Sequence, residues 1–137
     1  VWVNIASETG WKTIIGTAGS LAQIAVENKA VRFGQNGSGG WWLNGAAIEK
    51  DAWHHIVGVY DGTQATLYLN GEKQAGPTTQ AFDSDHGVTV IVVYTPGGNE
   101  WMHGLVDEPA VYGSAFTAFE VQQLYAQGLQ NHQIVLQ

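Results

Sequence analysis

Residues 53–73 have the sequence WHHIVGVYDGTQATLYLNGEK, which contains the clearest structural signals in the chain. Residues 53–60 are rich in β-branched and aromatic side chains, which suit a pleated, half-buried surface. Asp61-Gly62 interrupts them, and residues 65–69 then alternate between apolar and polar side chains with the period of a strand. Asn70-Gly71 follows, and both residues tolerate the positive φ of a tight type I′ turn. The pattern predicts an antiparallel meander over this stretch.

The composition indicates one all-β domain. With 137 residues the chain is long enough for a single core. Its many short apolar runs, separated by glycines, are typical of a β-sandwich. We therefore expect residues 1–137 to form one domain of two antiparallel sheets. No apolar run approaches the ~20 residues that a membrane span requires.

The charge balance indicates which kinds of binding partner the protein can have. Acidic residues outnumber basic residues by 12 to 5, which gives a net charge of −7. This balance argues against nucleic acid, because a nucleic-acid-binding domain carries a basic surface. It is compatible with uncharged glycans, calcium and an extracellular setting. The chain has no cysteines, which excludes disulfides and thiolate metal sites. It starts at Val1 without a signal peptide, so we expect a processed product or a piece of something longer.

Further strands are expected on both sides of the meander. Residues 1–5 alternate as a strand, and residues 11–16 are expected to pair back onto them. Residues 21–27 and 30–34 are expected to form a hairpin around Asn28-Lys29. The other expected strands are 41–43, 88–94 and 101–112. Residues 88–94 are apolar on both faces, so we expect this strand to be covered on each side. The strand at 101–112 contains Pro109, so it must bulge or lie at an edge there. Residues 76–87 are expected to be an irregular connection.

One α-helix is expected near the C-terminus. Thr117 and Glu120 have the spacing of a capping box. Val121, Leu124 and Tyr125 form one apolar stripe. Gly128 is expected to end the helix, because glycine is the common residue just past a helix C-terminus.

The chain resembles a known fold family in two segments. The first segment consists of WHH, an apolar strand, a Tyr-Asp-Gly turn and LYLNG. The second segment consists of GLVDEPAVY at residues 104–112, followed by the helix FTAFEVQQLYAQG. Both resemble, in the same order, bacterial laminin-G-like domains of the concanavalin A type. The resemblance covers about residues 1–128 and implies a two-sheet antiparallel β-sandwich (jelly roll) with one short C-terminal helix.

The resemblance also implies that one or two strands normally precede Val1. Without them, we expect a gap or uncovered edge near the partner of residues 106–112. The tail at residues 132–137 is β-prone and apolar. It is expected to be an ordered strand that either fills this gap in its own subunit or is donated to a neighbour.

Six tryptophans are the main candidates for ligand contact. Aromatic faces stack on the C–H surfaces of sugar rings, while a sandwich core also absorbs such side chains. Trp2 and Trp53 have apolar neighbours and are assigned to the core, and Trp11 is ranked below the candidates that follow. Adjacent residues on a strand point to opposite faces, so one of Trp41 and Trp42 should face outward. The residues that we expect to bind a ligand are Trp41, Trp42, Trp101 and Asn99.

Asp107 is the candidate metal ligand. Acidic residues are depleted in strands, so Asp107 or Glu108 should project towards the interior or its rim, where it needs a partner. The resemblance implies that Asp107 contributes to a structural Ca²⁺ site together with backbone carbonyls. The alternative is a carboxylate held by backbone N–H groups. Asp83-Ser84-Asp85 has the alternate spacing of a calcium loop, and a solvated acidic turn is favoured there.

An enzyme is not expected. Glycosidases need two carboxylates that flank one bond, and Glu49-x-Asp51 is the nearest approach to the acidic motif of jelly-roll hydrolases, without its third acid. His54 and His55 are adjacent, so they should face opposite sides of a strand. No serine lies in a nucleophile-elbow context. A glycoside hydrolase or lyase is therefore the weakest alternative.

The resemblance implies a non-catalytic binding module, extracellular or at the cell surface. Carbohydrate binding or adhesion, with a polysaccharide or glycoconjugate as partner, is the first hypothesis. The second is a structural subunit that self-associates through sheet edges into a filament or surface layer. Fold alone does not decide between them.

Overall fold

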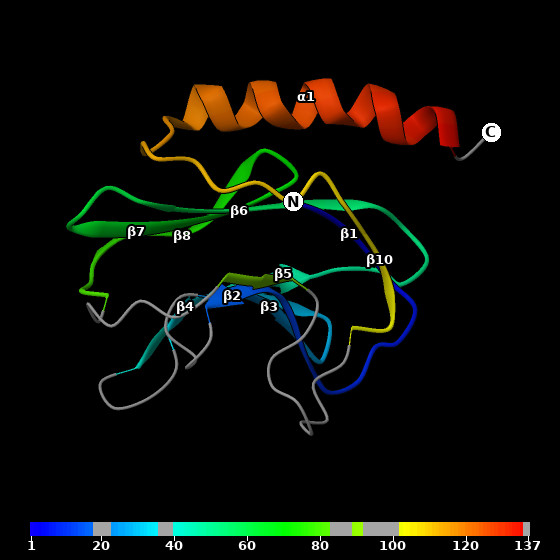
Figure 1. Cartoon of the computed structure of the whole chain (residues 1–137), viewed down its shortest axis with the longest axis horizontal. Coiled ribbons are helices and arrows are strands. Elements are labelled where there is room, and N and C mark those ends of the chain that lie inside the picture. The colour runs from blue at the N-terminus through cyan, green and yellow to red at the C-terminus, as the bar shows by residue number, and fades with distance from the viewer. Residues whose placement is uncertain (18–22, 36–39, 83–88, 92–101, 136–137) are drawn as a thin grey trace.

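The computed structural model describes residues 1–17, 23–35, 40–82, 89–91 and 102–135. In these ranges the chain forms two antiparallel five-stranded sheets that stack face to face, with a helix across the outside of one of them (Figure 1). The expected fold class, a two-sheet antiparallel β-sandwich of the jelly-roll type with a C-terminal helix, is confirmed.

The first sheet has the strand order β10-β1-β6-β7-β8. Its strands are β1 (Trp2–Ile5), β6 (His54–Tyr60), β7 (Gln64–Leu69), β8 (Glu72–Thr79) and β10 (Gly104–Asp107). The second sheet has the order β5-β4-β3-β2-β9. Its strands are β2 (Trp11–Thr17), β3 (Gln23–Glu27), β4 (Ala30–Gln35), β5 (Trp41–Ala47) and β9 (Thr89–Ile91). The helix, α1, spans Ala118–Val135.

The predicted meander is confirmed as β6, β7 and β8. Asp61 organises its first turn, because its Oδ1 accepts hydrogen bonds from the backbone N–H groups of Thr63 (2.8 Å) and Gln64 (2.7 Å). These bonds lower the pKa of the Asp61 carboxyl. Asn70 and Gly71 have φ values of 52° and 79°, as the tight turn requires. β8 continues to Thr79, so the irregular connection starts four residues later than expected.

The hairpin of β3 and β4 is also confirmed. Asn28 and Lys29 have φ values of 45° and 75°, which a two-residue hairpin turn demands. Glu27 therefore pairs with Ala30, and Ala25 with Arg32. This register fixes which side chains share the outer face of the second sheet.

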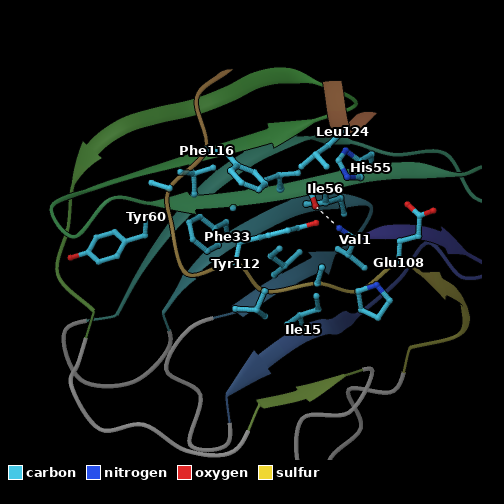
Figure 2. Close-up of a pocket in the computed structure, with 18 of the residues that line it drawn as sticks. Val1, Ile15, Phe33, His55, Ile56, Tyr60, Glu108, Tyr112, Phe116 and Leu124 are labelled. Atoms are coloured by element: carbon cyan, nitrogen blue, oxygen red, sulfur yellow. Dashed lines mark hydrogen bonds between the residues drawn. The ribbon is translucent and has the colours of Figure 1, made fainter. Parts of the chain in front are cut away.

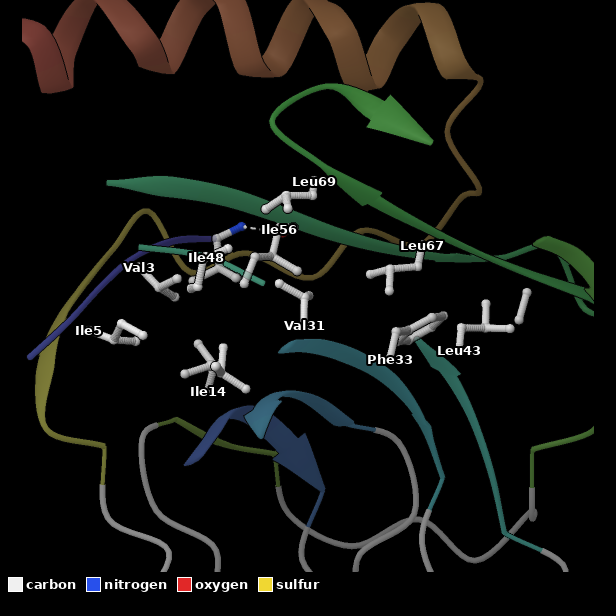
Figure 3. Packing of buried hydrophobic residues seen from close by; sticks show 13 residues of the cluster. Val3, Ile5, Ile14, Val31, Phe33, Leu43, Ile48, Ile56, Leu67 and Leu69 are labelled. Atoms are coloured by element: carbon white, nitrogen blue, oxygen red, sulfur yellow. Dashed lines mark hydrogen bonds between the residues drawn. The ribbon is translucent and has the colours of Figure 1, made fainter. Parts of the chain in front are cut away.

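The core fills the space between the two sheets. Along β1, β4 and β7 the buried cluster takes alternate residues, as the period of two requires. The buried residues are Val1, Val3, Ile5, Ile14, Val26, Val31, Phe33, Leu43, Ile48, Ile56, Ala65, Leu67 and Leu69 (Figure 3).

A second buried layer lies between the first sheet and α1. Trp2 points away from the core towards the helix, where its ring lies 4.2 Å from that of His132, 5.0 Å from His55 and 5.6 Å from Tyr125. Trp53 packs on His132 from the side, at 4.7 Å. We call these five residues the Trp2 cluster. Trp2 is buried, as expected, and Trp53 is half-buried.

The helix is longer than expected because Gly128 does not end it. A Cβ at Gly128 would lie 2.4 Å from Nε1 of Trp2, so this glycine lets the helix approach the indole. The helix start agrees with the prediction: Glu120 Oε2 accepts a hydrogen bond from the Thr117 backbone N–H (2.7 Å), and Thr117 Oγ1 accepts one from the Glu120 N–H (3.3 Å).

The predicted C-terminal strand is wrong. Residues 132–135 belong to α1, and residues 136–137 lie outside the described ranges. His132 explains the difference, since its ring stacks on Trp2 and its Nδ1 lies 2.8 Å from the carbonyl oxygen of Gly128 one turn earlier. A tail that packs as a helix cannot fill a gap or be donated as a strand.

Two strand predictions also need correction. β2 pairs with β3 and β9, and not with β1, which pairs with β6 and β10. The strand predicted at 88–94 is observed as β9 over Thr89–Ile91, and the other residues of that prediction lie outside the described ranges. β10 ends at Asp107, because Glu108 has a φ of 47° and turns the chain out of the sheet. Pro109 therefore lies outside the strand.

Candidate functional site

The outer face of the second sheet carries two tryptophans. Val26, Val31, Phe33 and Leu43 point into the core, so their neighbours along each strand point outward. Cross-strand pairing then places Thr13, Ala25, Arg32 and Asn44 in one row on that outer face. We call this surface the Trp11–Trp42 face. Its residues are Trp11, Thr13, Ala25, Glu27, Arg32, Trp42 and Asn44.

Trp11 and Trp42 meet across this face although they come from β2 and β5. Their ring centroids are 4.8 Å apart and the rings are nearly perpendicular, at 74°. Edge-to-face contact of this kind is the geometry that aromatic pairs prefer. Trp11 Nε1 donates a hydrogen bond to Thr13 Oγ1 (3.1 Å), and both indoles are half-buried. Thr13 and Ala25 are fully buried although they face outward.

A row of polar groups borders the two indoles. Arg32 donates from Nε and Nη2 to Glu27 Oε2, at 3.2 and 3.1 Å, and from Nη1 to Asn44 Oδ1. The guanidinium is therefore held from both sides. The Asn44 side chain is exposed. Carboxylate, amide and guanidinium groups together offer both donors and acceptors to a hydroxyl-rich ligand.

Of the four predicted ligand-binding residues, Trp42 alone lies on this face in the part of the chain that the structure describes. Trp41 faces the interior: its ring packs on Phe82 (4.8 Å) and Phe33 (6.0 Å), and its Nε1 donates to the Ala81 carbonyl oxygen (3.1 Å). The expected opposition of Trp41 and Trp42 is therefore observed. Trp101 and Asn99 lie outside the described ranges, as does the acidic turn at residues 83–85.

One sequence signal points to the rest of the face. The predicted turn at Asn28-Lys29 fixes the register of β3 and β4, and with it the neighbours of Arg32. Trp11 opens a strand after a turn, a position that by itself does not indicate ligand binding. Its contact with Trp42 joins residues 31 positions apart on strands that are not neighbours, and no local pattern reveals it.

Asp107 and Glu108 do not point into the interior. Both are exposed at the end of β10, at the rim of the sandwich that the sequence prediction also allowed. Asp107 Oδ1 accepts a hydrogen bond from the Glu108 backbone N–H (2.8 Å), and its Oδ2 lies 3.4 Å from Nε2 of His132. This geometry is that of the hydrogen-bonded alternative. Within the described residues, no group of three or more His, Asp and Glu side chains is arranged to hold a metal ion, although calcium also takes carbonyl ligands.

Calcium binding at Asp107 stays a prediction with a direct test. If Asp107 is a ligand, chelation of calcium-loaded protein should lower the melting temperature, since a ligand that binds only the folded state stabilises it, by about 2.7 kcal/mol at 100 times the Kd. Asp107→Asn should remove most of that response. An unchanged melting curve after chelation would leave the hydrogen-bonded arrangement as the whole role of Asp107.

The residues considered for catalysis do not form a carboxylate pair around a cleft. Glu49 and Asp51 are exposed in the loop between β5 and β6. Glu49 lies 3.5 Å from Lys29 Nζ, and Asp51 lies 3.4 Å from Lys50 Nζ. His54 and His55 occupy opposite faces of β6, and His55 belongs to the Trp2 cluster.

A match to a protein-family model supports the fold. Residues 1–122 match a laminin-G family model described as the concanavalin A-like lectin/glucanases superfamily. No curated protein matches the chain at a significant level. A solved structure of an S-layer domain-containing protein (residues 221–444) from Clostridium thermocellum is similar, with 21% identity over 91% of this chain and 67% of that chain, and a TM-score of 0.46. Among the described residues, no helix combines the length and the hydropathy that crossing a membrane requires.

Proposed function

Because the chain belongs to the concanavalin A-like lectin/glucanases superfamily, we propose that it is a non-catalytic module that binds carbohydrate on the Trp11–Trp42 face. The proposed setting is extracellular or at the cell surface, with a polysaccharide or glycoconjugate as partner. The superfamily includes both lectins and glucanases. The non-catalytic assignment therefore rests on the exposed, ion-paired positions of Glu49 and Asp51.

The observation that carries the proposal is the half-buried Trp11–Trp42 pair beside a polar row. Indole rings combine a large apolar surface with a polar N–H group, which suits the C–H surface and the hydroxyls of a sugar. The Trp11 ring supports Trp42 from the side, so Trp42 loses little side-chain freedom when a ligand stacks on it. Less lost freedom on binding favours affinity.

The charge of the protein favours uncharged sugars. The net charge of −7 repels anionic glycans at long range. On the face itself, Arg32 is already paired with Glu27 at 3.1 Å, so it is not an unpaired cation for a sulfate or uronate. We therefore expect neutral polysaccharides to be retained and anionic ones not.

Retention on insoluble polysaccharides, together with a glycan array, tests the proposal. Trp42→Ala should weaken binding by at least about fivefold, because the stacking contact is worth on the order of 1 kcal/mol beyond the buried area. Phe119→Ala is the matched control: it removes an exposed aromatic ring, 66% accessible, from α1, away from the face. Binding that is equal in wild type and Trp42→Ala would contradict the proposal.

Self-association through sheet edges is the second candidate. β10 forms one end of the first sheet, and its Leu105 is 59% exposed. Free strand edges with apolar side chains are templates for pairing with another chain. Sedimentation in the absence of glycan separates the two functions. Concentration-dependent assembly of a chain that binds no glycan would support the structural role.

A further inference from the structure

Arg32, the one arginine of the chain, lies in the middle of the Trp11–Trp42 face. Its neighbour Phe33 lines the cavity between the two sheets (Figure 2). The residues on either side of Phe33, Arg32 and Gly34, therefore point outward. The Arg32 side chain is 22% exposed and ends beside the exposed Asn44. A ligand on this face can therefore reach the guanidinium group.

The hydrogen bonds of Arg32 leave two of its donors for a ligand. An arginine side chain has five N–H donors in one rigid plane. Nε–H and one N–H of Nη2 donate to Glu27 Oε2, at 3.2 and 3.1 Å, and one N–H of Nη1 donates to Asn44 Oδ1. Among the described residues, the second N–H of Nη1 and that of Nη2 have no partner. Both nitrogens are bonded to the same carbon, so the two donors have a fixed spacing.

The charge of Arg32 is neutralised although these donors remain. Glu27 pairs with the guanidinium at 3.1 Å, and an anionic ligand would lie close to the same carboxylate. A pair of uncharged acceptor oxygens therefore suits the site better than an anion. Two hydroxyl groups on adjacent carbons of a sugar ring form such a pair, because each hydroxyl oxygen accepts hydrogen bonds.

Trp42 lies within reach of the same sugar residue. Arg32 pairs with Asn44, and Gly34 pairs with Trp42, so Arg32 and Trp42 are diagonal neighbours on one face of the sheet. Such neighbours lie about 7–8 Å apart, which one sugar residue can span. Gly34 has no side chain, so none from β4 stands directly opposite Trp42. A sugar that stacks on Trp42 can therefore place the hydroxyls of its edge against Arg32.

We propose that Arg32 determines the specificity of this face, by donating its two remaining N–H groups to two adjacent hydroxyls of a neutral sugar whose ring stacks on Trp42. This inference rests on the proposed carbohydrate binding and adds the class of sugar to it. Internal residues of a 1,4-linked pyranose chain keep adjacent hydroxyls at C2 and C3. Internal residues of a 1,3-linked chain keep hydroxyls at C2 and C4, which are not adjacent. The face should therefore prefer 1,4-linked chains.

Titration calorimetry with chains of equal length tests this preference. The probes are the 1,4-linked hexaoses of β-glucose, β-mannose and β-xylose, and the 1,3-linked hexaose of β-glucose. The 1,3-linked hexaose keeps an adjacent hydroxyl pair only in its terminal residue. Wild type should bind at least one 1,4-linked hexaose at least about fivefold more tightly than the 1,3-linked one, because two hydrogen bonds are at stake.

Arg32→Lys separates the shape of the guanidinium from its charge. Lysine keeps a cation beside Glu27 but lacks the planar pair of donors. Affinity for the preferred 1,4-linked hexaose should fall by about tenfold, whereas affinity for the 1,3-linked hexaose should change by less than about threefold. A general loss of the face would lower both. Lys50→Arg, in the exposed loop between β5 and β6, is the control and should leave both affinities unchanged.

A linkage preference that persists in Arg32→Lys would overturn this role of Arg32, and so would equal affinity of wild type for the two linkages. Failure to bind any 1,4-linked hexaose would overturn it as well, in a protein that retains other glycans through Trp42. These results leave carbohydrate binding on the face in place, because Trp42→Ala tests it separately. Binding of the hexaoses that Trp42→Ala does not weaken would instead contradict the proposed function itself.

Discussion

Gly128→Ala should destabilise the protein by on the order of 2 kcal/mol, the typical cost of overpacking a rigid contact. Alanine is ordinarily the better helix former by about 1 kcal/mol, so the expected sign is opposite to that of helix propensity. The cause is the Trp2 indole, whose Nε1, Cε2 and Cζ2 atoms would lie 2.4, 2.8 and 2.9 Å from the new Cβ. Thermal or denaturant unfolding measures the loss.

Two further variants isolate the contact. Gln130→Ala changes an exposed position of the same helix and should stay within about 0.5 kcal/mol of wild type. Trp2→Phe carries a smaller ring, so Gly128→Ala should cost less in that background. The difference gives the coupling between the two residues. A Gly128→Ala protein as stable as wild type would show that α1 does not pack on Trp2 this closely.

Stability should fall steeply as the pH decreases from 6.5 to 4.5, because the pKa of His55 is lowered to about 3. Burial is the main cause, and the Val1 amine and His132 lower it further. The unfolded chain then binds one more proton than the folded protein between pH 3 and 6.5. Stability therefore decreases by about 1.4 kcal/mol for each unit of pH in that window, or about 2.7 kcal/mol from 6.5 to 4.5. Denaturant unfolding at each pH measures the slope.

His55→Phe should remove most of this slope while keeping ring contacts with Trp2 and Tyr125. The Val1 amine titrates in a separate window: burial lowers its pKa from 8.0 to about 6, so its contribution to stability grows between pH 6 and 8 in both proteins. Acetylation of that amine serves as the control for the upper window. An equal loss of stability below pH 6.5 in wild type and His55→Phe would contradict this assignment.

Local residues made most of the fold predictable. The turns at Asp61-Gly62 and Asn70-Gly71 and the capping box at Thr117 specify their geometry within four residues, and each is observed. Gly128 misled the prediction because its role is a contact with Trp2, more than a hundred residues earlier. The alternation of apolar and polar residues in β2 likewise does not determine whether this strand pairs with β3 or with β1, because either pairing is compatible with the same pattern.

The candidate site was predictable only in part, because it also depends on contacts between residues that lie far apart in the sequence. Alternation required one of Trp41 and Trp42 to face outward, but the direction depends on which face packs against Phe33 and Phe82. Trp11 joins Trp42 only once the four strands from β2 to β5 have assembled. The left-handed φ of Glu108 exposes Asp107 and ends a strand that the apolar sequence would have continued.

The most direct test of the central claim uses the indole N–H resonances of the six tryptophans. A soluble fragment of a polysaccharide that retains the protein is titrated into ¹⁵N-labelled protein, and Trp11→Phe and Trp42→Phe assign the two resonances of the face. Carbohydrate binding on the Trp11–Trp42 face predicts that these two resonances shift together, while those of Trp2 and Trp53 under α1 stay in place. A titration that moves other resonances and leaves Trp11 and Trp42 unchanged would contradict the account.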